Sequence, residues 1–244
     1  MRKILFMACV LCLSVGYALV PNDNGTENQT DAPDSLANLS KIDACEELYN
    51  TLGLMDEGID LSAFEKAYDG YDKIGNKQKE ILTLIDFTKP STQERMFVID
   101  MKQRKVLFKT HVAHGQNSGE NYATSFSNRN GSHQSSLGFY LTGNTYIGKK
   151  GYSLKLNGLE AGINDNAFTR GVVIHAAAYA NPSVIPGQGR LGRSHGCPAL
   201  PEALNRPVID AIKDGSVLFI YADNTNYLAQ SRLLSHQNSG GRAS

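Results

Sequence analysis

The spacing of hydrophobic residues changes once along the chain. Residues 42–52 and 61–74 carry apolar side chains at intervals of three and four, which is the pattern of amphipathic helices. After Glu80 the apolar residues gather instead in short runs rich in Ile, Val, Phe and Thr, with polar turns between them. These runs predict strands over residues 81–87, 95–101, 105–112, 138–142, 152–156, 171–175 and 217–221.

The predicted strands define the fold class. No long helix stands between them, so the chain does not fit a parallel sheet built from strand–helix–strand units. We expect a mostly-β domain over residues 79–224, with a small helical preface over residues 41–78 and a tail over residues 225–244. A short helix is expected over residues 206–213, with Pro207 in its first turn.

The first residues predict export. Arg2 and Lys3 precede an apolar run over residues 4–15, and small residues follow up to a cleavage point after Ala18. We interpret residues 1–18 as a signal peptide, because the run is shorter than the ~20 apolar residues that a membrane-spanning anchor needs. The protein is then expected in the periplasm or elsewhere in the cell envelope, with no stable membrane anchor after cleavage.

Composition and charge narrow the choice of partners. Residues 19–40 are rich in Asn, Asp, Thr and Pro, and they predict a disordered linker. The chain has 24 basic and 24 acidic residues, but residues 19–60 are strongly acidic, so the remainder carries a basic excess. This excess favours an anionic partner. The basic residues are scattered rather than clustered, so nucleic acid is not predicted, and the sequence identifies no protein partner.

The cysteines offer a nucleophile. The chain has four, and two of them leave with the predicted signal peptide. Cys45 falls on a predicted helix, where a buried apolar thiol is typical. Cys197 lies in a polar segment flanked by glycine, which favours a reactive thiol. A disulfide between Cys45 and Cys197 is the alternative in an exported protein.

A histidine can complete the chemistry. His175 ends an apolar strand and should therefore enter a cleft. Cysteine and histidine together suffice for nucleophilic catalysis, because an imidazole can take the thiol proton and return it to the leaving group. Ser194, His195 and Gly196 directly precede Cys197 and are expected to shape the site.

Other side chains are candidates for contacts with the substrate. His111 and His114 have a spacing seen in metal sites, but residues three apart on a strand face opposite ways. Neither a metal nor another cofactor is therefore predicted. His114 is instead expected to line the cleft, and Tyr152 is expected to contact the substrate from its strand.

His175, followed by Ser194-His195-Gly196-Cys197, resembles the signature of the L,D-transpeptidase catalytic domain, the YkuD-like family. Further segments resemble the murein L,D-transpeptidase branch of Gram-negative bacteria, at residues 112–115, 118–119, 126–128, 135–138, 152–154 and 191–193. Together these segments run from Arg95 to Ala222. The resemblance implies a β-sandwich or barrel-like domain of the YkuD type, with a short helix after the catalytic cysteine.

The resemblance also implies a reaction on peptidoglycan stem peptides. Cys197 would attack the bond after the third residue of a tetrapeptide stem and expel the terminal D-Ala, with His175 as the base. The side-chain amine of a second stem would then take the acyl group and form a 3–3 cross-link. Backbone N–H groups of His195, Gly196 and Cys197 would stabilise the oxyanion.

One position departs from the family pattern. Many members carry Arg or Asn two places after the cysteine, where this chain has Pro198 and Ala199. We expect Arg193 or Arg190 to supply the missing contact, because a guanidinium can bind a carboxylate with two N–H groups. The departure leaves open a hydrolase with the same site, either an L,D-carboxypeptidase or an enzyme that cuts a link to peptidoglycan. A peptidoglycan-binding module without catalysis is the third alternative.

Overall fold

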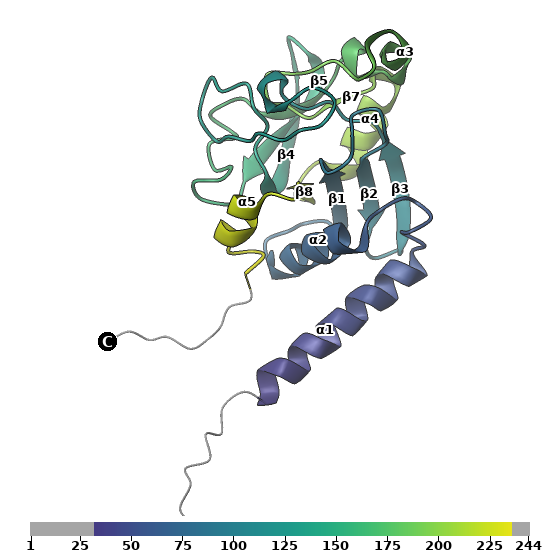
Figure 1. Ribbon diagram of the computed structural model, residues 1–244, viewed down its shortest axis with the longest axis vertical. Coiled ribbons are helices and arrows are strands. Elements are labelled where there is room, and N and C mark those ends of the chain that lie inside the picture. Colours follow the sequence, from purple (N-terminus) through teal and green to yellow (C-terminus); the bar gives the residue numbers. More distant parts are fainter. Residues whose placement is uncertain (1–31, 236–244) are drawn as a thin grey trace, which may run out of the picture.

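The structure, a computed structural model, describes the chain over residues 32–235, with side chains from residue 41 onward (Figure 1). The predicted signal peptide and residues 19–31 of the predicted linker lie outside the described residues. Two helices come first, α1 (Ala32–Thr51) and α2 (Leu61–Lys73). Of these, α2 lies against the sheet and α1 packs on α2 (Figure 1).

The helical preface begins earlier than predicted. Residues 32–40, which we assigned to a disordered linker, form the start of α1. The prediction was wrong here because it used composition alone. Pro33 is tolerated in the first turn of a helix, Asp34 is favoured there by the helix dipole, and the residues that follow include the good helix formers Leu and Ala.

All eight strands belong to one sheet, in the order β3-β2-β1-β8-β4-β5-β6-β7. Neighbouring strands are antiparallel, except that β1 and β8 are parallel and so are β6 and β7. The strand bounds are Ile81–Asp86 (β1), Met96–Asp100 (β2), Lys105–Thr110 (β3), Gly138–Gly148 (β4), Gly151–Gly158 (β5), Val173–Ala176 (β6), Ala199–Leu200 (β7) and Val217–Tyr221 (β8). The mostly-β fold class is confirmed, and the seven predicted strands correspond to β1–β6 and β8.

The two edges of the sheet meet. β3 and β7 are the outermost strands, and the chain just after β3 returns to pair with β7. Ala113 N donates to Ala199 O at 2.8 Å, and Ala199 N donates to Ala113 O at 3.3 Å. A second bridge joins Gly115 to Ser194. The sheet is therefore nearly closed into a barrel, as predicted, and the closing seam includes the segment around Cys197.

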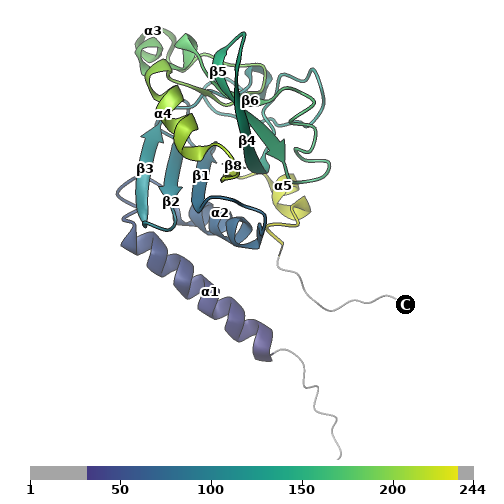
Figure 2. The ribbon, with the colours of Figure 1, turned by 180° about the vertical axis from the view of Figure 1, so that it is seen from behind.

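Two helices follow the seam. α4 (Glu202–Ile212) packs on β5 and β6, and Figure 2 shows it in front of the sheet. It begins four residues before the predicted helix, so Pro207 lies inside it rather than in its first turn. Burial of Val208, Ile209 and Ile212 outweighs the hydrogen bond that the proline removes. In the predicted tail, α5 (Thr225–Gln230) is anchored by the buried Tyr227.

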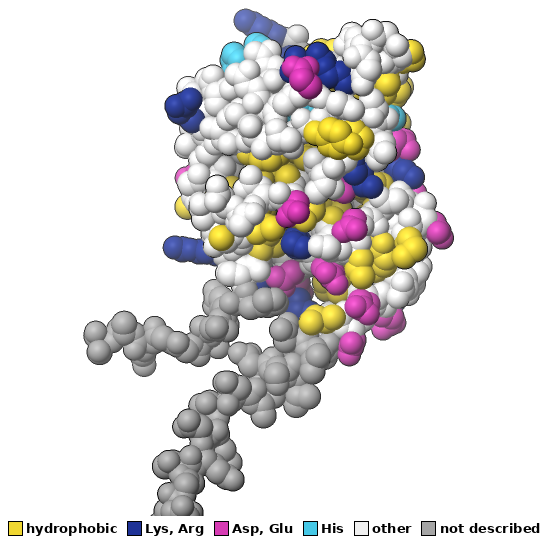
Figure 3. Space-filling model, in the orientation of Figure 1, with side chains coloured by type: hydrophobic (Ala, Val, Ile, Leu, Met, Phe, Trp, Pro, Cys, Tyr) yellow, Lys and Arg dark blue, Asp and Glu magenta, His cyan; other side chains and the backbone are white. Residues whose placement is uncertain are grey.

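Short helical turns lie in the loops between these elements. The turns are η1 (Gln116–Ser118), η2 (Ala178–Ala180), η3 (Pro182–Val184) and α3 (Ile185–Gln188). Within residues 32–235, no helix combines the length and the apolar character needed to cross a membrane. Figure 3 shows acidic side chains gathered toward the helical preface, while histidine side chains lie at the opposite end of this face.

The contact between α2 and the sheet gives a test of the packing. A Cβ atom at Gly70 of α2 would lie 2.0 Å from Cζ of Phe139, whose buried ring stacks on Phe219 with centroids 4.0 Å apart. Gly70→Ala should therefore destabilise the domain by about 1–3 kcal/mol through overpacking. Gly75→Ala is the matched control, since nothing lies within 4 Å of its Cβ position. Urea unfolding followed by circular dichroism should separate the two variants, and equal midpoints would contradict the close contact between α2 and Phe139.

Candidate active site

Pairing between β6 and β7 brings the two predicted catalytic residues together. His175 of β6 pairs with Ala199 of β7, so the parallel register places Cys197 beside Val173. The sulfur of the half-buried Cys197 donates to the carbonyl oxygen of Gly171 at 3.7 Å. Cys197 and His175 therefore lie two residues apart in register, next to the closing seam of the barrel.

A tight turn presents the thiol. Gly196 has a φ of 116°, which disfavours any residue with a side chain, and a Cβ there would lie 2.7 Å from the carbonyl oxygen of Gln134. Ser194 spans the turn, because its Oγ accepts from Gly196 N at 3.0 Å and donates to Cys197 O at 2.6 Å. The Gly196 N–H is thus already bonded, which removes it from the three expected oxyanion donors and leaves those of His195 and Cys197.

His175 is arranged to accept a proton. It is 1% exposed, and its Nδ1 lies 2.7 Å from the carbonyl oxygen of Ala176. Because a carbonyl can only accept, this contact assigns the proton to Nδ1. Nε2 is buried and has no hydrogen-bond partner among the described residues. Burial lowers the pKa of His175 below its ordinary value, the Ala176 carbonyl opposes this, and Lys150 adds to the lowering. The imidazole is therefore neutral at pH 7.

The thiol is also neutral at rest. Burial raises the pKa of Cys197 above its ordinary value of 9.0, although the Val173 N–H and the charges of Lys150 and Arg170 lower it in part. The resting site therefore holds a protonated thiol and a neutral imidazole rather than a thiolate–imidazolium pair. Deprotonation must then accompany attack on the substrate, which is general-base catalysis.

This protonation state predicts how Cys197 reacts with iodoacetamide. In the Cys45→Ala protein, the alkylation rate should still be rising above pH 9, because burial holds the thiol pKa above 9.0. An ordinary thiol such as glutathione, measured alongside, should approach its plateau at lower pH. Rates from intact-mass spectrometry would decide the point, and a plateau near neutral pH would show an ion pair instead.

The sequence did not point to Arg170, which holds the loop over residues 127–136 beneath the turn at Gly196. Its Nη1 donates to Ser127 O at 2.7 Å and to Ser136 Oγ at 2.5 Å, and its Nη2 donates to Ser132 Oγ at 3.2 Å and to Gln134 O at 2.8 Å. The charge of Arg170 also lowers the pKa of Cys197. No local motif marks this arginine, because its partners lie more than thirty residues before it in the chain.

Tyr179 of η2 was also missed. Its hydroxyl is buried without a hydrogen-bond partner among the described residues, and its ring packs against the Cα of Gly192. Burial raises the pKa of Tyr179 to about 12, with a further contribution from Cys197. The phenol therefore adds a polar group to the surroundings of the thiol, alongside Nε2 of His175.

The structure corrects the expected role of His114. The side chain is buried, its Nδ1 receives a hydrogen bond from Arg95 Nη2 at 2.8 Å, and its Nε2 lies 3.2 Å from the carbonyl oxygen of Gly119. Burial, with the charge of Arg95, lowers the pKa of His114 to about 4. His114 therefore supports the loop that follows it and does not line a cleft. Local sequence could not show this, because Arg95 lies 19 residues earlier in the chain, directly before β2.

Tyr152 also faces away from the site. Ser153, its neighbour on β5, pairs with His175, and successive residues of a strand point to opposite faces. Tyr152 accordingly lies on the face covered by α4, where its hydroxyl donates to Asp210 Oδ1 at 2.7 Å. Arg206 lies over the Tyr152 ring, 4.4 Å from its centroid. The predicted contact between Tyr152 and the substrate is therefore wrong.

Arg193 and Arg190 are bound to a carboxylate of the chain itself. Arg193 Nη1 lies 2.7 Å from Glu120 Oε1, and Arg190 Nε lies 2.9 Å from Glu120 Oε2. Arg193 Nη1 also donates to the carbonyl oxygens of Gln116 and Gly119. These bonds join the loop after β3 to the loop before Cys197. The expected contact with a substrate carboxylate would require Arg193 to give up Glu120.

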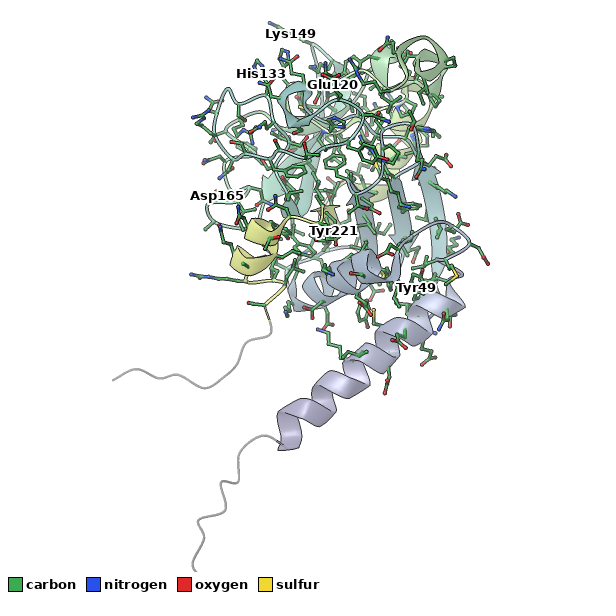
Figure 4. The ribbon with its side chains drawn as sticks, viewed as in Figure 1. Tyr49, Glu120, His133, Lys149, Asp165 and Tyr221 are labelled. Atoms are coloured by element: carbon green, nitrogen blue, oxygen red, sulfur yellow. The ribbon has the colours of Figure 1, made fainter. Side chains whose placement is uncertain are left out.

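His195, two residues after Arg193, is exposed. Its ring stacks on that of His133 at a centroid distance of 4.2 Å. Figure 4 labels His133, Glu120 and Lys149 toward the end of the barrel opposite α1.

Cys45 is buried on α1, and burial raises its pKa to about 12. Cys45 and Cys197, the two cysteines among the described residues, are both free, so the alternative of a disulfide between them is wrong. Among the described residues, no three His, Cys, Asp or Glu side chains gather to hold a metal.

The barrel-like sheet, with a thiol and a buried imidazole next to its closing seam, defines a candidate acyl-transfer domain. A sequence profile described as the L,D-transpeptidase catalytic domain matches residues 55–221. This match covers more than half of the chain, so the protein belongs to the L,D-transpeptidase catalytic domain family. The resemblance drawn from the motifs is confirmed, while the Gram-negative branch stays a prediction.

Several solved structures are similar to this chain. An L,D-transpeptidase from Mycobacterium smegmatis is 16% identical, with 59% of this chain and 59% of that chain covered and a TM-score of 0.38. L,D-transpeptidase 3 from Mycobacterium tuberculosis is 13% identical, with 59% of this chain and 62% of that chain covered and a TM-score of 0.37. An L,D-transpeptidase from Stackebrandtia nassauensis is 15% identical, with 75% of this chain and 78% of that chain covered and a TM-score of 0.36. The chain spans about three fifths of the length of the two mycobacterial proteins. No curated protein matches the sequence.

Proposed function

We propose that the protein is an L,D-transpeptidase that cross-links peptidoglycan stem peptides through an acyl-enzyme on Cys197. One observation carries this proposal in a chain of this family: Cys197 and His175 lie two residues apart in register on the same edge of the sheet, and the buried Nε2 of His175 is unpartnered among the described residues while its Nδ1 is held by a backbone carbonyl. The predicted signal peptide supports a place of action in the cell envelope, where these stems are found.

The first step forms the acyl-enzyme. Nε2 of His175 takes the Cys197 proton as the sulfur attacks the carbonyl carbon of the third stem residue. The backbone N–H groups of His195 and Cys197 would bind the resulting oxyanion, and one such donor typically contributes ~3 kcal/mol. The carbon–nitrogen bond then breaks, the imidazolium gives its proton to the departing amine, and D-Ala leaves. A thioester remains on Cys197.

The second step transfers the acyl group. The side-chain amine of another stem attacks the thioester and loses a proton to His175. The carbon–sulfur bond breaks, and the proton returns to the thiolate of Cys197. Two stems are then joined by an amide, and the free enzyme is restored. If water attacks instead, the same site acts as an L,D-carboxypeptidase.

Position 199 cannot supply the family's usual contact after the cysteine. Ala199 is fully buried and pairs with both His175 and Ala113, so a large side chain there would disrupt the seam. The small residue is therefore part of how this barrel closes. Contacts to the substrate must come from other parts of the site.

Purified mature protein, incubated with disaccharide-tetrapeptide and followed by mass spectrometry, tests the proposal. Cross-linked dimers together with released D-Ala are the expected products. Tripeptide alone would replace transfer with hydrolysis. Binding without turnover, while Cys197 still forms a carbapenem adduct, would reject both transfer and release of D-Ala. The alternatives left would be cleavage of a different link to peptidoglycan and peptidoglycan binding without catalysis.

A further inference from the structure

A row of side chains leads from the site to an exposed tyrosine. Tyr146 of β4 pairs with Ser153 of β5, and Ser153 pairs with His175 of β6. Directly opposed residues of antiparallel strands project to the same face, so all three lie on the face of His175. The row is two strand spacings long, or ~10 Å. Ser153 is fully buried, whereas Tyr146 is 39% exposed.

A lysine and a second aromatic ring extend this exposed end. Lys155 lies two residues along β5 from Ser153 and therefore on the same face. Its Nζ is 5.8 Å from the centroid of the Tyr146 ring and 5.7 Å from that of the Phe168 ring. Phe168 is 57% exposed. We call Tyr146, Lys155 and Phe168 the aromatic platform. Exposed aromatic side chains gathered in this way commonly mark a binding site.

The platform is connected to the thiol through one turn of chain. Gly171 N donates to the carbonyl oxygen of Phe168 at 3.1 Å, and the carbonyl oxygen of Gly171 accepts from Cys197 Sγ. Lys155 pairs with Val173, the residue beside Cys197. Lys149 and Lys150 are exposed at the tip of the hairpin formed by β4 and β5, and Figure 4 shows Lys149 at the same end as His133. The surroundings of the platform are therefore basic, which suits an anionic polymer.

The spacing matches the substrate of the proposed function. The bond to be attacked lies after the third residue of the stem, and the stem begins at a sugar of the glycan strand. Three residues of extended peptide span roughly 10 Å. Cys197 lies beside Val173, and Val173 pairs with Lys155, so Lys155 of the platform is two strand spacings, or ~10 Å, from Cys197. With the third carbonyl at Cys197, the sugar that carries the stem reaches Lys155 and the rings beside it.

We propose that the aromatic platform binds the sugar ring that carries the donor stem, so that the protein selects stems attached to glycan over free peptides. This proposal rests on the proposed function. Aromatic rings offer a rigid apolar face for the C–H groups of a sugar, and the Lys155 ammonium can donate to its oxygens. Neither Tyr146 nor Phe168 takes part in the acyl transfer itself.

The test compares two substrates in three proteins. kcat/KM is measured for disaccharide-tetrapeptide and for free tetrapeptide with wild type, Tyr146→Ala/Phe168→Ala and Ile147→Ala. Ile147 is a matched control, because it is 73% exposed on the same strand but pairs with Tyr152, on the opposite face. The double variant should lose at least about tenfold on the disaccharide substrate and change little on the free peptide. Ile147→Ala should leave both values unchanged.

Two results would overturn the proposal: equal losses on both substrates, or no preference of the wild type for the disaccharide form. If wild type turns over neither substrate, the proposed function fails separately. Calorimetric binding of the same two ligands then decides the matter. Tighter binding of the disaccharide form, lost in the double variant alone, supports the platform, and equal binding of both ligands rejects it.

Discussion

Cys197→Ala should abolish turnover of disaccharide-tetrapeptide, with kcat reduced by at least about 10⁴-fold. Without the sulfur no thioester can form, and binding together with the remaining oxyanion donors retains only a small part of the catalysis. The loss should be chemical rather than structural, because Cys197 is only half-buried and the turn is held by Ser194 and Gly196.

Cys45→Ala is the matched control, since it removes the other described thiol. Cys45 is buried on α1, away from the closing seam, so this variant should keep the wild-type rate even if it unfolds slightly earlier. Product formation by mass spectrometry and urea midpoints of both variants make the comparison. Substantial turnover by a folded Cys197→Ala protein would remove Cys197 from the reaction.

His175→Gln should lower kcat by about 10²- to 10⁴-fold, because glutamine cannot take the thiol proton. The pH profile should change as well. In wild type, activity should fall as pH drops through the His175 pKa, and burial places this limb below the ordinary value of 6.5. The variant should lose that limb, and its residual rate should instead follow ionisation of the thiol.

His111→Gln provides the comparison for a histidine outside the site. His111 Nε2 lies 3.2 Å from the carbonyl oxygen of Thr92, so the residue has a similar backbone contact but no part in the chemistry. Its rate and pH profile should match those of wild type. A His175→Gln protein that kept the wild-type acid limb would assign that limb to another group.

The strands show how far local pattern carries. β1, β2, β3 and β8 lie within a residue or two of their predicted bounds, because each is a compact apolar run between polar turns. β4 continues to Gly148, well beyond the predicted end at Thr142. The polar residues after Thr142 coincide with an irregularity in the pairing of β4 with β5, which breaks the alternation that marks a strand.

Sequence by itself identified the candidate nucleophile and base and most of the local backbone of this protein. A thiol next to glycine, a histidine at a strand end and the strand-forming runs are properties of short segments, so each can be recognised from neighbouring residues alone. The tertiary structure alone decided which side chains surround Cys197 and His175 and which have other partners. His114 contacts Arg95, Tyr152 faces α4, and Arg193 pairs with Glu120. Arg170 holds the loop beneath the turn at Gly196. These outcomes depend on strand order and register between segments far apart in the chain, and one residue of register moves a side chain to the other face.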